Sequence, residues 1–128
     1  MDRAAALRPS RPQTSHLPGS LVIDALRSYG RLFGDDLLVE HPAGSGVRRP
    51  LRAVADDLAD RLVSLFREGA DGRRPVHGPY VKFHTDPAWH DALPFHEYFH
   101  GDTGAGLGAS HQTGWTGLVA DLLLRREP

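Results

Sequence analysis

The chain has 128 residues and a mass of 14.0 kDa, which corresponds to one domain or a part of one. Its formal net charge is −1, so a partner attracted by net charge, such as nucleic acid or an anionic membrane surface, is not expected. The absence of cysteine excludes disulfides, thiolate metal sites and a cysteine nucleophile. Because no apolar run approaches the roughly 20 residues of a membrane span and no signal core begins the chain, we expect a cytoplasmic protein.

The first 19 residues are predicted to form a disordered or extended arm. They contain Pro9, Pro12 and Pro18, with serine, threonine and glycine around them. Proline removes a backbone donor and fixes φ, so a long helix is not expected here. The folded region is therefore expected to span residues 20–128.

Two helices are predicted in the first half of this region. Residues 20–33 have apolar side chains at helical spacing, Ser20 as a possible N-cap and Gly34 after the last turn. Residues 50–66 have a wider apolar stripe, with Pro50 in the first turn. Between them we expect a short extended piece at residues 37–40 and a glycine-rich turn.

The second half has less regular patterning. Residues 74–83 and 92–99 contain proline, glycine and aromatic residues, which favour two short strands or extended segments. A glycine-rich loop is expected at 101–110, and a third helix from about residue 113 to about 125. The predicted fold is mostly α, with about three helices, short extended segments and this loop.

One motif suggests metal chemistry. The segment from His96 to His100 has the form H-E-x-x-H, in which two histidines on one helix face bind zinc and a glutamate, here Glu97, acts as general base. Pro94 and Gly101 flank the motif and oppose a helix of several turns, and a third ligand is not evident. A zinc-dependent hydrolase is therefore an alternative, and the favoured interpretation has no metal and no cofactor.

A longer motif begins at Glu97. The run E-Y-F-x-x-x-T-G-x-G-L-G-A-x-H-Q-T-G-W-T extends from Glu97 to Thr116 without a gap, and it follows two aromatic stretches that begin at Lys82 and Phe95. Together they resemble the C-terminal end of glycoside hydrolase family 63 and the mannosylglycerate-hydrolase-like glucosidases. The resemblance implies that residues 20–128 are the C-terminal portion of an (α/α)6 barrel.

The resemblance also implies a site and a reaction. These enzymes are usually inverting and use two carboxyl groups, about 6.5–9.5 Å apart, as acid and base. The position of the base falls on Glu97, and its aromatic neighbours are expected to raise the pKa of Glu97 by desolvation. An α-glucoside or related carbohydrate is the implied substrate, and the residues implied to bind it are Trp115, His111, Gln112 and Tyr98.

Some features of the family pattern are absent. No residue of this chain corresponds to the family's catalytic acid, and His96 stands where tyrosine is usual. We therefore expect a truncated or split glycosidase that is inactive alone, so its status as an enzyme is open. Its expected partners are the missing part of the barrel or a second copy of the chain. A non-catalytic carbohydrate-binding remnant is a further alternative.

Overall fold

The computed structural model describes residues 17–111 and 114–125. For residues 17, 18, 115 and 116 it describes the backbone alone. The prediction of a mostly α fold is confirmed for this part of the chain. Its five α-helices are α1 (Leu17–Phe33), α2 (Leu51–Ser64), α3 (Val81–Thr85), α4 (Pro87–His90) and α5 (Val119–Leu124).

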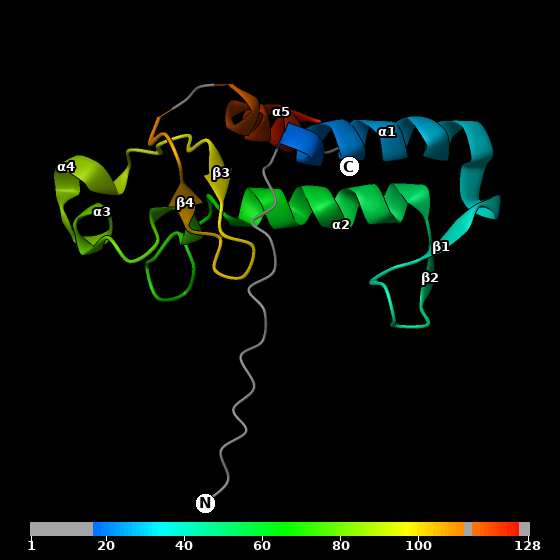
Figure 1. Cartoon of the computed structure of the whole chain (residues 1–128), viewed down its shortest axis with the longest axis horizontal. Coiled ribbons are helices and arrows are strands. Elements are labelled where there is room, and N and C mark those ends of the chain that lie inside the picture. The colour runs from blue at the N-terminus through cyan, green and yellow to red at the C-terminus, as the bar shows by residue number, and fades with distance from the viewer. Residues whose placement is uncertain (1–16, 112–113, 126–128) are drawn as a thin grey trace, which may run out of the picture.

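Two short antiparallel hairpins connect these helices, and three 3₁₀ turns accompany them. One hairpin lies between α1 and α2, and the other lies between α4 and α5 (Figure 1). The strands are β1 (Leu38–Glu40), β2 (Arg48–Pro50), β3 (Tyr98–Phe99) and β4 (Gly106–Leu107). The 3₁₀ turns are η1 (Gly34–Asp36), η2 (Pro75–His77) and η3 (Trp115–Leu118).

Helices α1 and α2 run antiparallel, side by side (Figure 1). Glycine on α1 permits the close approach, because a Cβ on Gly30 would lie 2.8 Å from Cγ of Arg52. Ile23 of α1 and Ala55 of α2 are fully buried at this contact. The pair forms the scaffold against which the second half of the chain packs.

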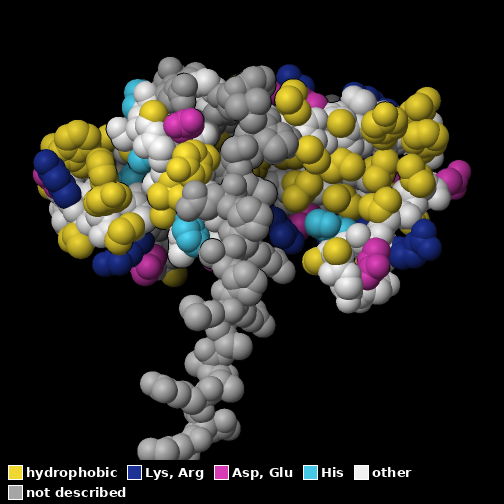
Figure 2. Space-filling view, viewed as in Figure 1, with side chains coloured by type: hydrophobic (Ala, Val, Ile, Leu, Met, Phe, Trp, Pro, Cys, Tyr) yellow, Lys and Arg dark blue, Asp and Glu magenta, His cyan; other side chains and the backbone are white. Residues whose placement is uncertain are grey.

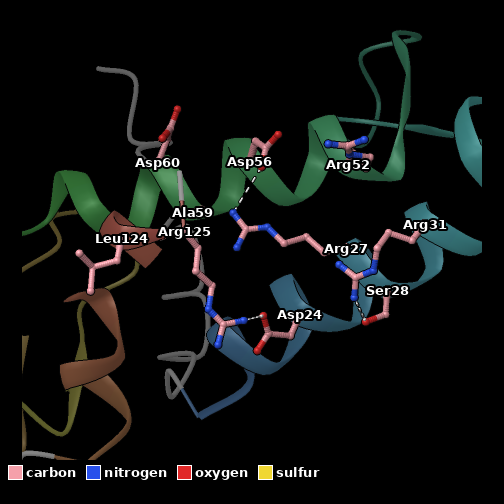
Figure 3. A pocket seen from close by; sticks show the side chains of 10 residues that line it. All are labelled: Asp24, Arg27, Ser28, Arg31, Arg52, Asp56, Ala59, Asp60, Leu124 and Arg125. Carbon is pink, nitrogen blue, oxygen red and sulfur yellow. Dashed lines mark hydrogen bonds and ion pairs between the residues drawn. The ribbon is translucent and has the colours of Figure 1, made fainter. Parts of the chain in front are cut away.

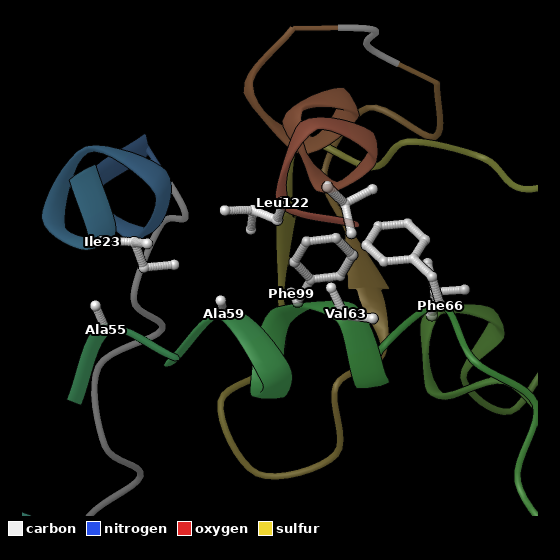
Figure 4. Close-up of a cluster of buried hydrophobic side chains, with 9 residues drawn as sticks. Ile23, Ala55, Ala59, Val63, Phe66, Phe99 and Leu122 are labelled. Atoms are coloured by element: carbon white, nitrogen blue, oxygen red, sulfur yellow. The ribbon is translucent and has the colours of Figure 1, made fainter. Parts of the chain in front are cut away.

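The core lies along one face of α2 and continues under α5 and the β3–β4 hairpin (Figure 4). Phe66 connects α2 with the hairpin. Its ring centroid lies 5.6 Å from that of Phe99, in an edge-to-face arrangement, and 5.9 Å from that of Phe95. Burial of each large apolar side chain contributes about 1.5–3 kcal/mol. The buried apolar cluster is Ile23, Ala55, Ala59, Val63, Phe66, Val76, Phe99, Val119 and Leu122.

The helix predicted at residues 20–33 begins earlier than expected. It starts at Leu17, and Pro18 lies in its first turn. N–H groups in the first turn make no hydrogen bond within the helix, so the N–H that proline lacks is not needed there. The prediction that Ser20 is an N-cap is wrong. Its side chain is buried within α1, and its hydroxyl has no hydrogen-bond partner among the described residues.

The predicted second helix and the extended piece before it are confirmed. α2 covers residues 51–64, and β1 lies within the predicted segment 37–40. The β1–β2 loop is held to α2 by His41, whose Nε2 lies 2.8 Å from Oδ2 of Asp57. This hydrogen bond is the main reason that the pKa of Asp57 lies below its usual value.

The prediction of extended structure at residues 74–83 is wrong. This segment contains η2 and the start of α3. Pro75 begins η2 and Pro87 begins α4, because the fixed φ of proline suits the first turn of a helix. Asp86 adds an N-cap to α4 by accepting the N–H of Ala88 at 2.9 Å.

Two further predictions are confirmed only in part. Residues 92–99 contain one short strand, β3, and are otherwise irregular. The expected helix from about 113 to 125 is divided into η3 and α5. No helix among the described residues has the length and apolar character needed to cross a lipid bilayer.

Candidate functional site

The β3–β4 hairpin carries most of the residues that the sequence singles out. Tyr98 pairs with Leu107 and Phe99 with Gly106 in its antiparallel ladder. The pairing continues beyond the strands, because the N–H of Glu97 donates to the carbonyl of Ala109 at 3.0 Å. The hairpin therefore fixes the backbone on both sides of the candidate base.

Ala109 binds both the backbone and the side-chain carboxylate of Glu97. Oε2 accepts the N–H of Ala109 at 3.2 Å, and no partner is recorded for Oε1 within the described part of the chain. The residue is exposed to solvent. The predicted enclosure of Glu97 by aromatic side chains is therefore not found among the described residues.

Gly108 makes room for this arrangement. A Cβ at this position would lie 2.7 Å from Oε2 of Glu97 and 2.7 Å from Cε1 of Tyr98. The φ of Gly108 is also +72°, a conformation that favours glycine. Gly108 therefore lets the chain directly after β4 pass against the carboxylate of Glu97 and the half-buried Tyr98.

His111 lies near Phe95 at the open end of the hairpin. Its Nδ1 accepts the N–H of Phe95 at 3.3 Å, and its ring is 5.9 Å from the Phe95 ring. The acceptor role of Nδ1 assigns the proton of the neutral imidazole to Nε2. The structure thus brings three predicted residues, Glu97, Tyr98 and His111, into one hairpin.

Gln112 lies outside the described residues. The backbone of Trp115 forms the first residue of η3, but its side chain is also outside the description. The two remaining predicted sugar contacts therefore stay predictions.

The motif H-E-x-x-H does not lie on a helix. Its central residues form β3, and in an extended strand the two histidines are separated by about 13 Å, whereas neighbours on one helix face are about 6 Å apart. Nδ1 of His100 accepts the N–H groups of Asp102 and Thr103. The described residues contain no group of three side chains arranged to hold a metal ion.

His96 faces the interior. It is 9% exposed, its Nδ1 has no hydrogen-bond partner in the part of the chain that the structure describes, and Gly106 lies directly against its ring. Burial, and then the nearby charge of His111, hold the pKa of His96 below its usual value. His96 is thus a core residue of the hairpin rather than an exposed ligand.

A pocket of about 810 Å³ adjoins the other side of the hairpin. The sequence pattern does not predict this pocket, because its walls come from separate segments between the end of α2 and the start of β4. The charged residues of its lining do not form a recognisable sequence motif, and they come together only when the chain folds. The polar side chains on its walls are Ser64, Arg67, Glu68, Asp71, Arg73, Arg74, His84, His100 and Thr103.

A second, larger cleft of about 1130 Å³ lies beside the α1–α2 pair and is lined by charged groups (Figure 3). Arg27 lies 3.4 Å from Asp56 across the two helices. Arg125 of the segment after α5 lies 3.9 Å from Asp24. These ion pairs connect α1 with α2 and with the segment after α5, so we assign the charged residues of these pairs a structural role.

Comparison with known proteins finds a relative in yeast. Over 102 residues the chain is 48% identical to the uncharacterized protein YMR196W of Saccharomyces cerevisiae (strain ATCC 204508 / S288c). The match covers 78% of this chain and 9% of the yeast protein, so the chain spans less than a tenth of that relative's length. No family model matches the chain, and no solved structure matches it.

These comparisons correct the predicted family. The resemblance to glycoside hydrolase family 63 and the mannosylglycerate-hydrolase-like glucosidases is wrong, because no glycosidase family or structure matches and the yeast relative is uncharacterized. The physical reason lies in the motif itself. Gly104, Gly106 and Gly108 of the motif stand where a Cβ would meet neighbouring side chains, and Phe99 lies in the core, so these residues have a structural role in the hairpin.

Two buried histidines lead to a prediction about pH. Burial is the main cause that lowers the pKa of His77 and of His96 from the ordinary histidine value of 6.5. The unfolded chain then binds more protons than the folded chain below that value. We expect stability to be fully present above about pH 6.5 and to fall as the pH decreases further.

Urea denaturation followed by circular dichroism at about pH 8 and about pH 5 measures this effect. The His96→Asn variant should show a smaller loss between the two conditions, because it removes one of the two buried imidazoles. A denaturation midpoint that is the same at both pH values would contradict the prediction.

Proposed function

We propose that the β3–β4 hairpin is a carbohydrate site in which Glu97 acts as general base in the hydrolysis of an α-glucoside or related sugar. One observation carries the proposal: a solvent-exposed carboxylate is fixed through Oε2 by the N–H of Ala109, and Oε1 has no hydrogen-bond partner among the described residues. A fixed carboxylate with one open oxygen can take a proton from water in a defined direction.

The neighbouring groups support a sugar as the ligand. Tyr98 has a hydroxyl and His111 has an Nε2–H, and both belong to the same hairpin as Glu97. Such donors suit the hydroxyl groups of a pyranose, and an indole face, predicted for Trp115, suits its C–H groups. The proposal concerns this hairpin and includes no metal or cofactor.

The reaction needs a second carboxyl group. In an inverting mechanism Glu97 would remove a proton from the water that attacks the anomeric carbon, and an acid about 6.5–9.5 Å away would protonate the leaving oxygen. The proposal assigns that acid to no residue of this chain. We therefore expect the chain to bind ordinary glycosides without turning them over.

The proposal does not depend on a barrel. An antiparallel pair such as α1–α2 occurs in helical bundles and in barrels alike, so the (α/α)6 arrangement stays a prediction.

A substrate with an activated leaving group tests the base separately from the acid. Fluoride leaves α-glucosyl fluoride with little need for protonation, so a base alone can support its hydrolysis. We expect the 128-residue chain to release fluoride above the buffer rate. Glu97→Gln should lower that rate by about 10²–10⁴-fold, or to background. Glu68→Gln, another exposed glutamate, is the matched control and should have no effect.

Binding without release is the second candidate function. The exposed hairpin and the single assigned carboxylate favour a non-catalytic carbohydrate-binding role if the base proves inactive. Saturable NMR shifts at Tyr98 and His111 with methyl α-glucoside, but no fluoride release, would select this role. Neither shifts nor release would overturn the proposal of a carbohydrate site.

A further inference from the structure

One side of α1 is charged and lines the cleft beside the α1–α2 pair. Asp24, Arg27 and Arg31 are spaced by three and four residues, so at 100° per residue they lie within about 60° of the helix circumference. All three line the cleft of about 1130 Å³. On the side of the helix pair seen in Figure 2, hydrophobic side chains gather instead. The cleft therefore collects the charged groups of α1.

The antiparallel register of the two helices brings two arginines to the same level of the cleft. Arg27 of α1 pairs with Asp56 of α2 at 3.4 Å. Arg31 lies one turn further along α1, and Arg52 lies one turn before Asp56, so these two arginines lie opposite each other. The packing agrees, because a Cβ on Gly30, next to Arg31, would lie 2.8 Å from Cγ of Arg52. Figure 3 shows both arginines at the same end of the cleft.

This basic end of the cleft has two positive charges without an opposite charge. Arg31 and Arg52 are exposed, and neither forms an ion pair with a carboxylate among the described residues. The other end of the cleft is acidic, with Asp24 and Asp60 in its walls, and there Arg125 lies 3.9 Å from Asp24 (Figure 3). The chain thus supplies an opposite charge at the acidic end, and the described residues supply none at the basic end.

We propose that the basic end of the cleft binds a phosphate group through the guanidinium groups of Arg31 and Arg52 and the hydroxyl of Ser28. A guanidinium presents two parallel N–H donors that match two oxygens of a phosphate. Oγ of Ser28 accepts an N–H of Arg31 at 3.0 Å, so the serine O–H can donate to a phosphate oxygen. A dianion between the two guanidinium groups also offsets their mutual repulsion.

The cleft has room for more than a phosphate ion. Its volume of about 1130 Å³ is in the range of sites for small organic ligands. The walls beyond the basic end contain the charged groups of Asp24, Asp60 and Arg125, which suit the hydroxyl groups of a ligand. The phosphate is therefore either free or carried by a small polyhydroxy compound, and two probes distinguish these sources.

The phosphate site is independent of the proposed carbohydrate site. Arg31 lies near the end of α1 and Arg52 at the start of α2, whereas the β3–β4 hairpin lies toward the opposite end of the molecule (Figure 1). Glu97→Gln should therefore leave phosphate binding unchanged.

NMR titration of the 128-residue chain with inorganic phosphate and with glycerol phosphate, at constant ionic strength, tests the site. The Nε–H signals of Arg31 and Arg52 should shift in a saturable way. Arg31→Gln and Arg52→Gln should each raise the dissociation constant about tenfold or more, because each removes one guanidinium group. Arg67→Gln is the matched control: it removes an exposed arginine outside the cleft and should change the dissociation constant by less than about twofold.

Stability separates phosphate binding from a purely structural role. Without phosphate, Arg52→Gln should leave the midpoint of urea denaturation unchanged or raise it, since it removes a repelling charge and no ion pair. Added phosphate should raise the midpoint of the unaltered chain but not that of Arg52→Gln. A midpoint of Arg52→Gln that is lower without phosphate, or that rises with phosphate as in the unaltered chain, would contradict the proposal.

The two probes also identify the source of the phosphate. Tighter binding of glycerol phosphate would support a phosphate ester as the ligand, and equal binding would support free phosphate. If neither probe shifts the two arginine signals at about 10 mM, the proposal is wrong. Equal affinities of Arg52→Gln and Arg67→Gln would overturn it as well, because the response would then be a general effect of charge.

Discussion

Replacement of Phe99 by alanine is expected to lower the free energy of unfolding by about 3–5 kcal/mol. Phe99 is 2% exposed, and it connects β3 to α2 through the edge-to-face contact with Phe66. Truncation removes the buried ring and leaves a cavity between the hairpin and the helix pair. Because small domains have total stabilities of about 5–15 kcal/mol, the variant should lose a large fraction of its stability.

Urea denaturation monitored by far-UV circular dichroism measures this loss. Tyr80→Ala is the control, because Tyr80 is 61% exposed and its truncation should cost under about 1 kcal/mol. If Phe99→Ala unfolds at the same urea concentration as the unaltered chain, then the hairpin does not pack on α2 as described.

The Gly106→Ala variant is expected to be destabilised by about 3 kcal/mol. A Cβ at this position would overlap Cδ2 and Cγ of the His96 ring and would lie 2.7 Å from Nε2. His96 is buried, so its ring has little space into which it can move. The strain should separate β4 from β3 and disturb the backbone on both sides of Glu97.

Two comparisons make this prediction specific. Gly101→Ala is the matched control, because a Cβ there meets no atom within 4 Å, and it should change stability by less than about 0.5 kcal/mol. The double variant His96→Ala/Gly106→Ala should be more stable than the sum of the single losses predicts, since removal of the ring provides space for the new methyl group. Strict additivity would show that the two residues are not in contact.

The longest elements could be predicted from the sequence because their apolar periodicity extends over several turns. This holds for α2 and for most of α1. The start of α1 does not follow from the sequence pattern, because proline opposes a helix in its interior but is tolerated in a first turn, where Pro18 lies. The short helices after α2 were missed for a similar reason, since proline at Pro75 and Pro87 begins helical turns instead of extended segments.

The candidate site could be predicted only in part. The common site of Glu97, Tyr98 and His111 was implied only by the resemblance to a glycosidase family, which the comparisons do not support, but the hairpin does place the three residues together. The sequence could not show that Glu97 is exposed while His96 is buried, because both are polar neighbours in an aromatic segment. The same limitation applies to the H-E-x-x-H pattern, whose spacing has a different meaning in a strand and in a helix.

By itself, the sequence determined the local properties of this protein: the class of fold, the two long helices and the turns that require glycine. These follow from periodicity and from backbone conformations that act over a few residues. The tertiary structure decided which apolar face of α1 is covered and which imidazoles are buried. It also decided that Ala109 holds the carboxylate of Glu97. These features depend on contacts between residues distant in the chain, which local patterns do not encode.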